Sequence, residues 1–461
     1  MSENRRIARA AGVVAGLTLL SRIAGLARDV AVGFFFGTGA AADAFFVAFR
    51  IPNLLRRFVA EGAMSIALIP VFTGYITNRT REEAAEAMSA VATLMALVVL
   101  VLTAIGVLLA PQLTALFAPG FANDPEKFAL TIEITRRVFP FIFLVSMVAL
   151  ATGILHSVRH FAAPALAPVL LNLAIIAAAI VSQKFAEPVL VLAWGVVVGG
   201  VLQILVQIPP LVRHGIRLRP LWNPTHAAIR RSLGLMAPMI FGAAVYQINI
   251  LVSTVFASLL PSGSVSYLWY ADRIFEFPLG IFAVALGTAV LPSFSSQAAR
   301  SAYDEMWASL SFAMRLMTLI VVPAAVGLFA LAEPIVNVLF QRGAYGHEQV
   351  VQTAAALRCY AIGLWSVSMV RLVVPAFYAL GETRTPVITA AIAFVCNLVV
   401  SIALMGPVGA DGRFAVDLIA TLTSTLGIVD LRHAGLAAAT SVAATVNLYF
   451  CLLYTSPSPR D

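Results

Sequence analysis

Apolar segments recur from one end of the chain to the other, separated by short polar or Pro/Gly-rich turns. About 20 helical residues cross the hydrocarbon core of a bilayer, and most of these segments are at least that long. Backbone groups inside a bilayer must bond within their own segment, which favours helices. We therefore predict an all-α polytopic membrane protein with twelve spans, at residues 8–35, 43–76, 86–117, 131–156, 162–183, 188–212, 232–260, 267–296, 305–340, 351–379, 386–407 and 434–454.

The composition agrees with this pattern, because 61% of the 461 residues are hydrophobic and only 11% are charged. The net charge of +8 does not indicate a nucleic-acid partner. Its basic residues lie in short loops and inside apolar segments, without a basic stripe interleaved with aromatics. Cys359, Cys396 and Cys451 all lie in apolar stretches. Neither they nor the histidines have metal-ligand spacing, so we expect no metal site.

Loop charge predicts the orientation, since cytoplasmic loops are rich in Lys and Arg. Alternate loops differ in this respect, and the richer set includes the N-terminal loop, so we expect a cytoplasmic N-terminus. The richer set holds Arg5, Arg6, Arg9, Arg79, Arg81, Arg159, Arg213, Arg217, Arg219, Arg230, Arg231, Arg300 and Arg384. The poorer set holds Lys127, Lys184, Arg342, Arg413 and Arg432.

An internal repeat divides the chain. The motif AMSIALIPVF around Pro70 matches ALGTAVLPSF around Pro292, and Pro164 matches Pro386 at the same offset of 222 residues. This offset covers six predicted helices, an even number, so the halves point the same way, as in parallel-repeat transporters. Chance similarity between apolar segments is the alternative. We predict a six-helix lobe at 1–212, a basic cytoplasmic linker at 213–231 and a second lobe, with helices 7 to 12, at 232–450.

Ionised residues cluster in the first two predicted helices. Charge at membrane depth costs about 2.5–3.5 kcal/mol per residue even on a lenient scale, and it marks functional sites. The cluster contains Arg22, Arg28, Asp29, Asp43, Arg50, Arg56, Arg57 and Glu61.

Spacing places many of these residues on common faces. Asp43, Arg50 and Arg57 are seven residues apart and form one stripe, which Asn53 and Glu61 join. Pro52 lies within the stripe and should kink the helix, as a gate would require. The eighth helix adds Asp272, Arg273 and Glu276, as charge-pairing or gating groups and, for Arg273, a substrate contact.

Two interpretations of this cluster stay open. In the first, the charges form internal Arg–carboxylate pairs that hold the bundle together. In the second, surplus arginines bind an anionic substrate. Arginine offers planar, bidentate hydrogen bonding that suits phosphate oxygens. A diphosphate head group in a wet cavity between the lobes would engage several arginines at once.

Four stretches resemble the MurJ/MviN family of lipid II flippases. They are TLLSRIAGLARDVAVGFFFGTGAAADAFFVAFRIPNLLRRFVAEGAMSIALIPVF (18–72), PALAPVLLN (164–172), LAWGVVVGGVLQ (192–203) and SGSVSYLWYADRIFEFPLGIFAVALGTAVLPS (262–293). The resemblance implies the fold of the multidrug/oligosaccharidyl-lipid/polysaccharide exporter superfamily. The family's central-cavity charges fall on Arg22, Arg28, Asp29, Asp43, Arg56 and Arg273, and Arg50 stands where members carry Lys or Arg.

The implied function is alternating-access transport, not catalysis. The substrate would be undecaprenyl-diphosphate-linked disaccharide-pentapeptide, moved from the cytoplasmic to the periplasmic leaflet of the bacterial inner membrane for peptidoglycan synthesis. The alternatives are export of another polyprenyl-linked glycan, an enzyme of polyprenyl diphosphates, for which the sequence offers no nucleophile–base pair, and a non-transporting partner protein. We expect a monomer whose partners are this substrate and membrane lipid.

The chain departs from the family pattern in several places. Members have about fourteen helices, and we count twelve here. Residues 451–461, CLLYTSPSPRD, resemble the translation of a sequencing adapter, and we expect them to carry no function. Residues 408–431 resemble an insertion, and the overlapping stretch 409–432 is expected to be an amphipathic segment outside the bilayer. Asn397 and Ser401 stand where some members bind sodium with an Asn–Asp pair, so we expect no cofactor and doubt sodium coupling.

Overall fold

The computed structural model describes the backbone of residues 3–59 and 63–455, and the side-chain surroundings of residues 12–54, 68–234 and 247–454. Its regular elements within these ranges are helices, apart from one isolated bridge between Met405 and Asp430. Nine helical stretches in the described part of the chain are long and apolar enough to cross a membrane. The predicted fold class of an all-α, multi-pass membrane protein is confirmed. The count of twelve stays a prediction, because the spans predicted at 8–35, 43–76 and 232–260 include residues outside these ranges.

The chain divides into two compact units. Unit 1 comprises Met1–Phe36 and Ala40–Ile248, and unit 2 comprises Gly37–Gly39 and Asn249–Asp461. The division falls within one long helix, α11 (Ala227–Leu259). The lobe and linker boundaries expected from the sequence stay predictions.

Unit 1 is built from α1 to α10, a short 3₁₀ turn and the first part of α11. Its elements are α1 (Glu3–Phe36), α2 (Ala40–Val59), α3 (Ala63–Asn78), α4 (Arg81–Leu108), α5 (Ala110–Phe117), η1 (Pro119–Asn123), α6 (Pro125–Val138), α7 (Phe141–Ser157), α8 (Ala162–Ser182), α9 (Pro188–Leu205) and α10 (Ile208–Arg213).

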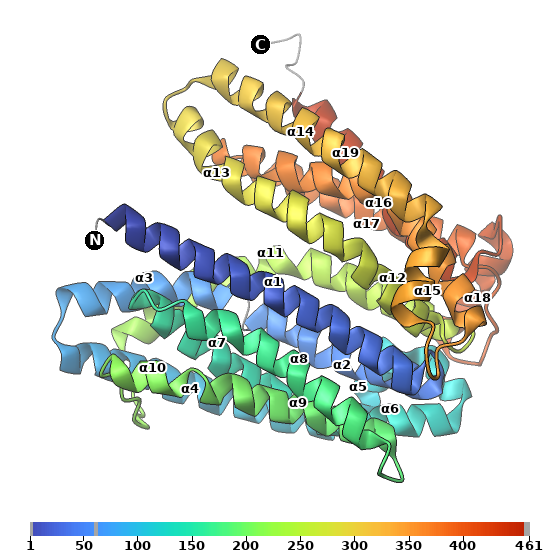
Figure 1. The fold of residues 1–461 in the computed structure, drawn as a ribbon, viewed down its shortest axis with the longest axis horizontal. Helices are drawn as coiled ribbons and strands as arrows, with labels where there is room; N and C mark the ends of the chain where they lie inside the picture. Colours follow the sequence, from blue (N-terminus) through green and yellow to red (C-terminus); the bar gives the residue numbers. More distant parts are fainter. Residues whose placement is uncertain (1–2, 60–62, 456–461) are drawn as a thin grey trace. The chain divides into compact units, whose positions relative to one another are not determined.

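Small residues bring the helices of unit 1 close together. Helix α8 packs against both α1 and α9, and α2 packs against α6 (Figure 1). A Cβ atom on Gly195 would lie 2.4 Å from the Ala178 Cβ, and one on Gly199 would lie 2.6 Å from Leu171 Cδ1. The glycines of α9 therefore permit the close crossing with α8, as small residues do in membrane bundles. A core cluster around Leu68, Phe72 and Ile154 joins α3, α4 and α7.

Unit 2 contains the rest of α11 and the later helices. They are α12 (Ser264–Pro278), the π-helical segment η2 (Leu279–Ala283), α13 (Val284–Ala299), α14 (Tyr303–Ala330), α15 (Ala332–Phe340), α16 (His347–Ala379), α17 (Arg384–Leu404), α18 (Phe414–Leu426) and α19 (Arg432–Thr455).

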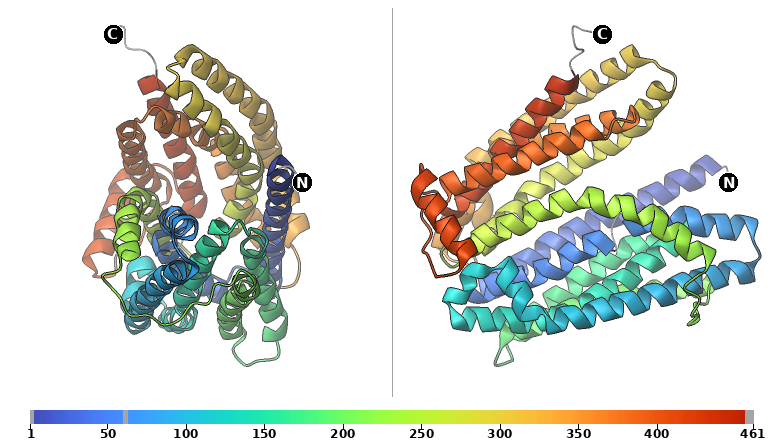
Figure 2. Two further views of the ribbon diagram at one scale, coloured as in Figure 1. Left: turned by 90° about the vertical axis from the view of Figure 1, so that its left-hand side faces the viewer. Right: turned by 180° about the vertical axis from the view of Figure 1, so that it is seen from behind.

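Helix α16 is the central element of unit 2. It packs against α14 on one side and α19 on another, and α17 packs against α19 (Figure 2). A second core cluster, with Phe294, Leu310 and Leu372, joins α13, α14 and α16. The predicted repeat matches these elements: Pro70 lies inside α3 and Pro292 inside α13. Phe72 and Phe294, two residues further on in each motif, are both fully buried.

Several predicted spans consist of more than one helix. The span at 86–117 contains α5 and most of α4, and the span at 305–340 contains α15 and most of α14. The span predicted from residue 86 begins at Arg81, because Thr80 accepts a hydrogen bond from the Glu83 N–H and completes a capping box. The amphipathic segment expected at 409–432 contains helix α18.

Candidate functional site

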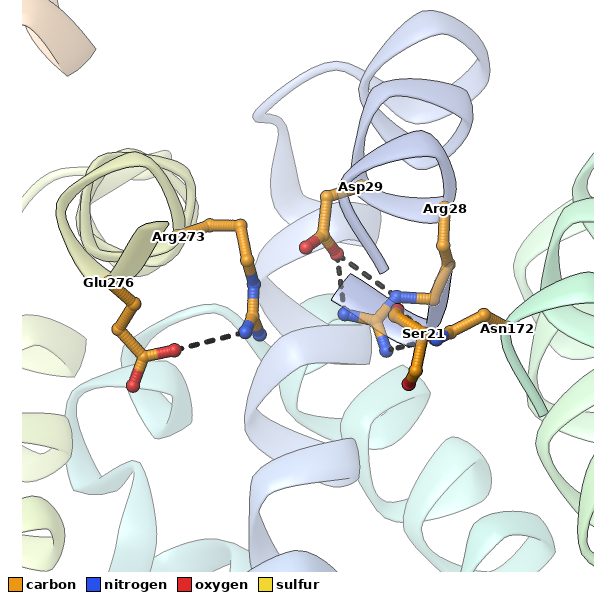
Figure 3. A network of polar contacts seen from close by, with 6 residues as sticks. All are labelled: Ser21, Arg28, Asp29, Asn172, Arg273 and Glu276. Carbon is orange, nitrogen blue, oxygen red and sulfur yellow. Dashed lines mark hydrogen bonds and ion pairs between the residues drawn. The ribbon is translucent and has the colours of Figure 1, made fainter. Parts of the chain in front are cut away.

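A buried polar network in unit 1 centres on Arg28 of α1. The Arg28 Nε and Nη2 groups donate to Asp29 Oδ1 at 3.1 and 2.7 Å, and its Nη1 donates to Asn172 Oδ1 at 3.2 Å (Figure 3). Asn172 of α8 in turn donates to the Ser21 carbonyl oxygen at 3.2 Å. Gly25 lies opposite Asn172, at a distance where a Cβ would make ordinary contact at 3.6 Å. Helices α1 and α8 are therefore joined by this network at their crossing.

Burial makes this network electrostatically strong. The Arg28 and Asp29 side chains are 10% and 1% exposed. The Arg28 guanidinium also lies 5.8 Å from the centre of the Phe49 ring of α2. A buried ion pair needs such extra hydrogen bonds to offset the desolvation of both charges. The contacts with Asp29 and Asn172 use three of the five N–H donors of a guanidinium.

A second buried ion pair joins α2 to α6. Lys127 Nζ lies 2.8 Å from Asp43 Oδ2, with side chains 6% and 1% exposed. The ammonium also lies 4.0 Å from the centre of the Phe121 ring. The loop assignment expected for Lys127 is wrong, because Asp124 accepts a hydrogen bond from the Lys127 N–H and caps a helix that starts at Pro125. The sequence DPEK at 124–127, a cap followed by Pro, was the available signal.

The charged site residues that the sequence predicts in unit 2 lie on α12. Arg273 Nη1 donates to Glu276 Oε2 at 3.1 Å, three residues along the helix (Figure 3). The Arg273 guanidinium lies 5.5 Å from the Trp269 ring, an aromatic contact that the charge pattern alone did not reveal. The Arg273 and Glu276 side chains are 31% and 39% exposed, and Asp272 is also partly exposed. This cluster is more open than the network around Arg28.

A π-helical segment follows the charged turn of α12. It begins at Leu279, directly after Pro278, whose ring removes a backbone donor from the helix. Such segments within helices often mark functional sites. The regular α-helix is therefore interrupted three residues after Glu276.

The remaining predicted residues are distributed differently. Arg22 and Arg50 are partly exposed. Pro52 is buried inside α2, and Asn53 donates to the Phe49 carbonyl oxygen of its own helix at 2.8 Å. Glu61 and the side chains of Arg56 and Arg57 lie outside the described residues. The site proposed from the sequence, including the gating role of Pro52, stays a prediction.

Asn397 and Ser401 are both 2% exposed on α17. Helix α17 contains no Asp or Glu, so at these positions the helix offers only neutral side-chain oxygens. Among the described residues, no three His, Cys, Asp or Glu side chains group together as a metal site. The absence of a cofactor and of sodium coupling stays a prediction.

Known proteins resemble this chain over nearly its whole length. The family described as "Lipid II flippase MurJ" matches residues 33–460. The lipid II flippase MurJ of Burkholderia cenocepacia is 39% identical over 436 residues, covering 93% of this chain and 84% of that protein. A probable lipid II flippase MurJ of Vibrio cholerae is 37% identical over 413 residues, covering 87% of this chain and 78% of its own length.

Solved structures show the same fold. The structure titled "Lipid II flippase MurJ, inward closed conformation" aligns with a TM-score of 0.79 at 27% identity, covering 96% of this chain and 87% of that one. An inward-facing MATE transporter of the MOP superfamily aligns with a TM-score of 0.74 at 15% identity, covering 96% of this chain and 97% of that one, which shows the fold alone. By its profile match and its curated relatives, the chain belongs to the MurJ family of lipid II flippases.

Proposed function

We propose that this protein moves the undecaprenyl-diphosphate-linked peptidoglycan precursor from the cytoplasmic to the periplasmic leaflet. Membership of the MurJ family supports this function, and the buried network around Arg28 is the observation that carries its chemistry. The protein is a transporter and not an enzyme, as its family indicates.

The diphosphate is the part of the substrate that the arginines would recognise. A guanidinium meets phosphate oxygens with paired N–H donors, and such charge-assisted bonds are roughly twice as strong as neutral ones. Arg28 is oriented in advance by Asp29 and Asn172, so little side-chain entropy is lost on binding. In unit 2, Arg273 lies near the Trp269 ring and is more exposed, and it is the guanidinium of that unit that the sequence assigns to substrate binding.

Transport proceeds by alternating access, in which the two lobes rock and open the substrate site first to one side and then to the other. Pro52 in α2 and the π-helical segment after Pro278 interrupt regular helices that carry charged residues, so they supply points of bending. The N-terminus lies in the cytoplasm, and the working unit is a monomer without a nucleic-acid partner.

The test is lipid II translocation by the purified protein in liposomes. Arg28→Ala should reduce the flipping rate at least about tenfold, because it removes a charge-assisted phosphate contact. Arg300→Ala is the matched control, because Arg300 pairs with Glu305 in a solvent-exposed bridge. This variant should flip lipid II at the normal rate.

A second variant separates binding from stability. Arg28→Ala removes the cation that pairs with the buried Asp29, and this loss by itself destabilises the fold. Arg28→Met/Asp29→Asn removes both charges, so its thermal stability should recover while its flipping stays lost. If this double variant flips at the normal rate, the guanidinium does not bind the substrate and the proposed site is wrong.

A further inference from the structure

Helix α18 (Phe414–Leu426) presents an apolar surface that unit 2 leaves uncovered. It connects α17 to α19 and packs against α17 at one end of the unit (Figure 1). Phe414 is 84% exposed and Leu418 48%, and Ile428 directly after the helix is 79% exposed.

The side chains of α18 divide into three faces at the helical spacing of 100° per residue. Val416, Ala420 and Thr423 form the buried face toward the rest of unit 2. The outward half has an apolar flank and a polar flank. The apolar flank contains Phe414, Leu418, Leu422 and Leu426, and the polar flank contains Asp417, Thr421 and Ser424. Thr425 lies between Phe414 and Leu418 on the apolar flank, where its hydroxyl donates to the Thr421 carbonyl oxygen at 2.7 Å.

Hydrogen bonds fix the rotation of the helix about its axis. Asp417 Oδ1 accepts from the Asp411 N–H at 3.0 Å and from the Gly412 N–H at 3.1 Å. At the other end, the Val408 N–H donates to Thr423 Oγ1 at 3.3 Å. The apolar flank therefore has one defined direction.

The neighbouring helices fix the depth of α18. Both α17 and α19 are long and apolar enough to span the membrane, so the segment between them begins and ends at a bilayer boundary. The 13 residues of α18 measure about 20 Å, too short for a hydrocarbon core of about 30 Å. On α17, Val395 and Val399 are 56% and 53% exposed, as lipid-facing residues are.

We propose that α18 lies along the boundary between lipid head groups and acyl chains, with its apolar flank in lipid and its polar flank in water. An outward half that is apolar on one side only matches a helix lying in the interface plane. Carboxylates outnumber basic groups at 409–431, which contains Asp411, Asp417 and Asp430 but only one basic residue, Arg413. Insertion of the apolar flank therefore holds the helix at the membrane, and attraction to anionic head groups does not.

Two exposed positions on the same helix make a matched test. Leu418→Cys reports the apolar flank and Ser424→Cys the polar flank, in a background with Cys359, Cys396 and Cys451 replaced by Ala. Each cysteine is spin-labelled in liposomes of phosphatidylethanolamine and phosphatidylglycerol. The relaxation enhancement by oxygen, which partitions into lipid, is compared with that by a water-soluble nickel chelate. Val395→Cys provides the reference for a position within the acyl chains.

We expect oxygen to dominate at Leu418 and the nickel chelate to dominate at Ser424, with oxygen-to-nickel ratios that differ severalfold. The same result is expected in liposomes of phosphatidylcholine alone, since no anionic lipid is required. Equal access of the nickel chelate to both positions would place the helix in water and overturn the proposal. Shielding of Leu418 from both reagents would also overturn it, because a protein partner or second copy would then cover the flank.

Discussion

At the scale of single residues, the buried charges of unit 1 have partners within that unit. Arg28 contacts Asp29 and Asn172, and Asp43 contacts Lys127. The physical reason is that a lone charge at low dielectric costs several kcal/mol, so arginine or lysine persists there beside a carboxylate. The two interpretations of the cluster are therefore compatible, because an ion pair that orders the bundle would also hold a guanidinium ready for the phosphate of the proposed substrate.

The Lys127–Asp43 pair gives a test of this view. Lys127→Met would remove the ammonium that pairs with the buried Asp43 carboxylate, and we expect a loss of about 3–5 kcal/mol in unfolding free energy. The double variant Asp43→Asn/Lys127→Met removes both charges and should recover most of the loss. Thermal unfolding of the purified proteins measures both. Equal instability of the single and double variants would mean that packing, not charge, is what Lys127 contributes.

A pH dependence is expected from the loop between α7 and α8. Burial lowers the pKa of His160, and the positive charges of His214 and Arg213 lower it further. The His160 and His214 rings lie 5.7 Å apart. When the folded-state pKa lies below the unfolded value, the unfolded chain binds more protons at pH values between the two. Stability should therefore be complete above the ordinary pKa of 6.5 and fall as the pH falls below it.

Substituting the neighbouring histidine should weaken this effect. His214→Asn removes one of the two positive neighbours of His160, so less stability should be lost as the pH falls below 6.5. His347→Asn, at an exposed helix start, is the control and should leave the pH profile unchanged. The profile is measured as the midpoint of thermal unfolding. A steeper acid loss in His214→Asn than in the unsubstituted protein would contradict this assignment.

At the scale of helices, close crossings depend on small residues. A Cβ atom on Gly363 of α16 would lie 2.6 Å from the Ser441 Cα of α19, a backbone atom that cannot move aside cheaply. Gly363→Ala should therefore lower the thermal midpoint. Gly327→Ala in α14 meets nothing within 4 Å and should raise stability by roughly 0.5–1 kcal/mol through helix propensity. If the two substitutions shift the midpoint in the same direction, the α16–α19 crossing is looser than described.

Helix positions followed well from the apolar pattern, and helix ends followed less well. The apolar run marks where a segment enters lipid, whereas a cap such as Thr80 or Asp124 sets where the helix begins. Lys127 was assigned to a loop for this reason, and its partner Asp43 is 84 residues away in the sequence. Distant pairing of this kind leaves no local periodic signal.

At the scale of the whole molecule, transport of a diphosphate should depend on voltage. Its negative charge leaves the negative side of the membrane, so an inside-negative potential favours export by about 2.3 kcal/mol per charge per 100 mV. We expect faster lipid II flipping in liposomes with an imposed inside-negative potential, relative to a potassium-clamped control. Flipping that is indifferent to the potential would contradict net movement of the head group's charge.

The sequence by itself determined the class of the molecule, because apolar length and charge cost are local properties that a bilayer reads directly. It also identified the repeat around Pro70 and Pro292 and the ionised residues of the first two helices. Only the tertiary structure decided the partners, joining Arg28 to Asn172 and Asp43 to Lys127. The reason is physical: in a low-dielectric interior a charge is stabilised by whichever opposite group packing brings near, and packing joins helices that are distant in the chain.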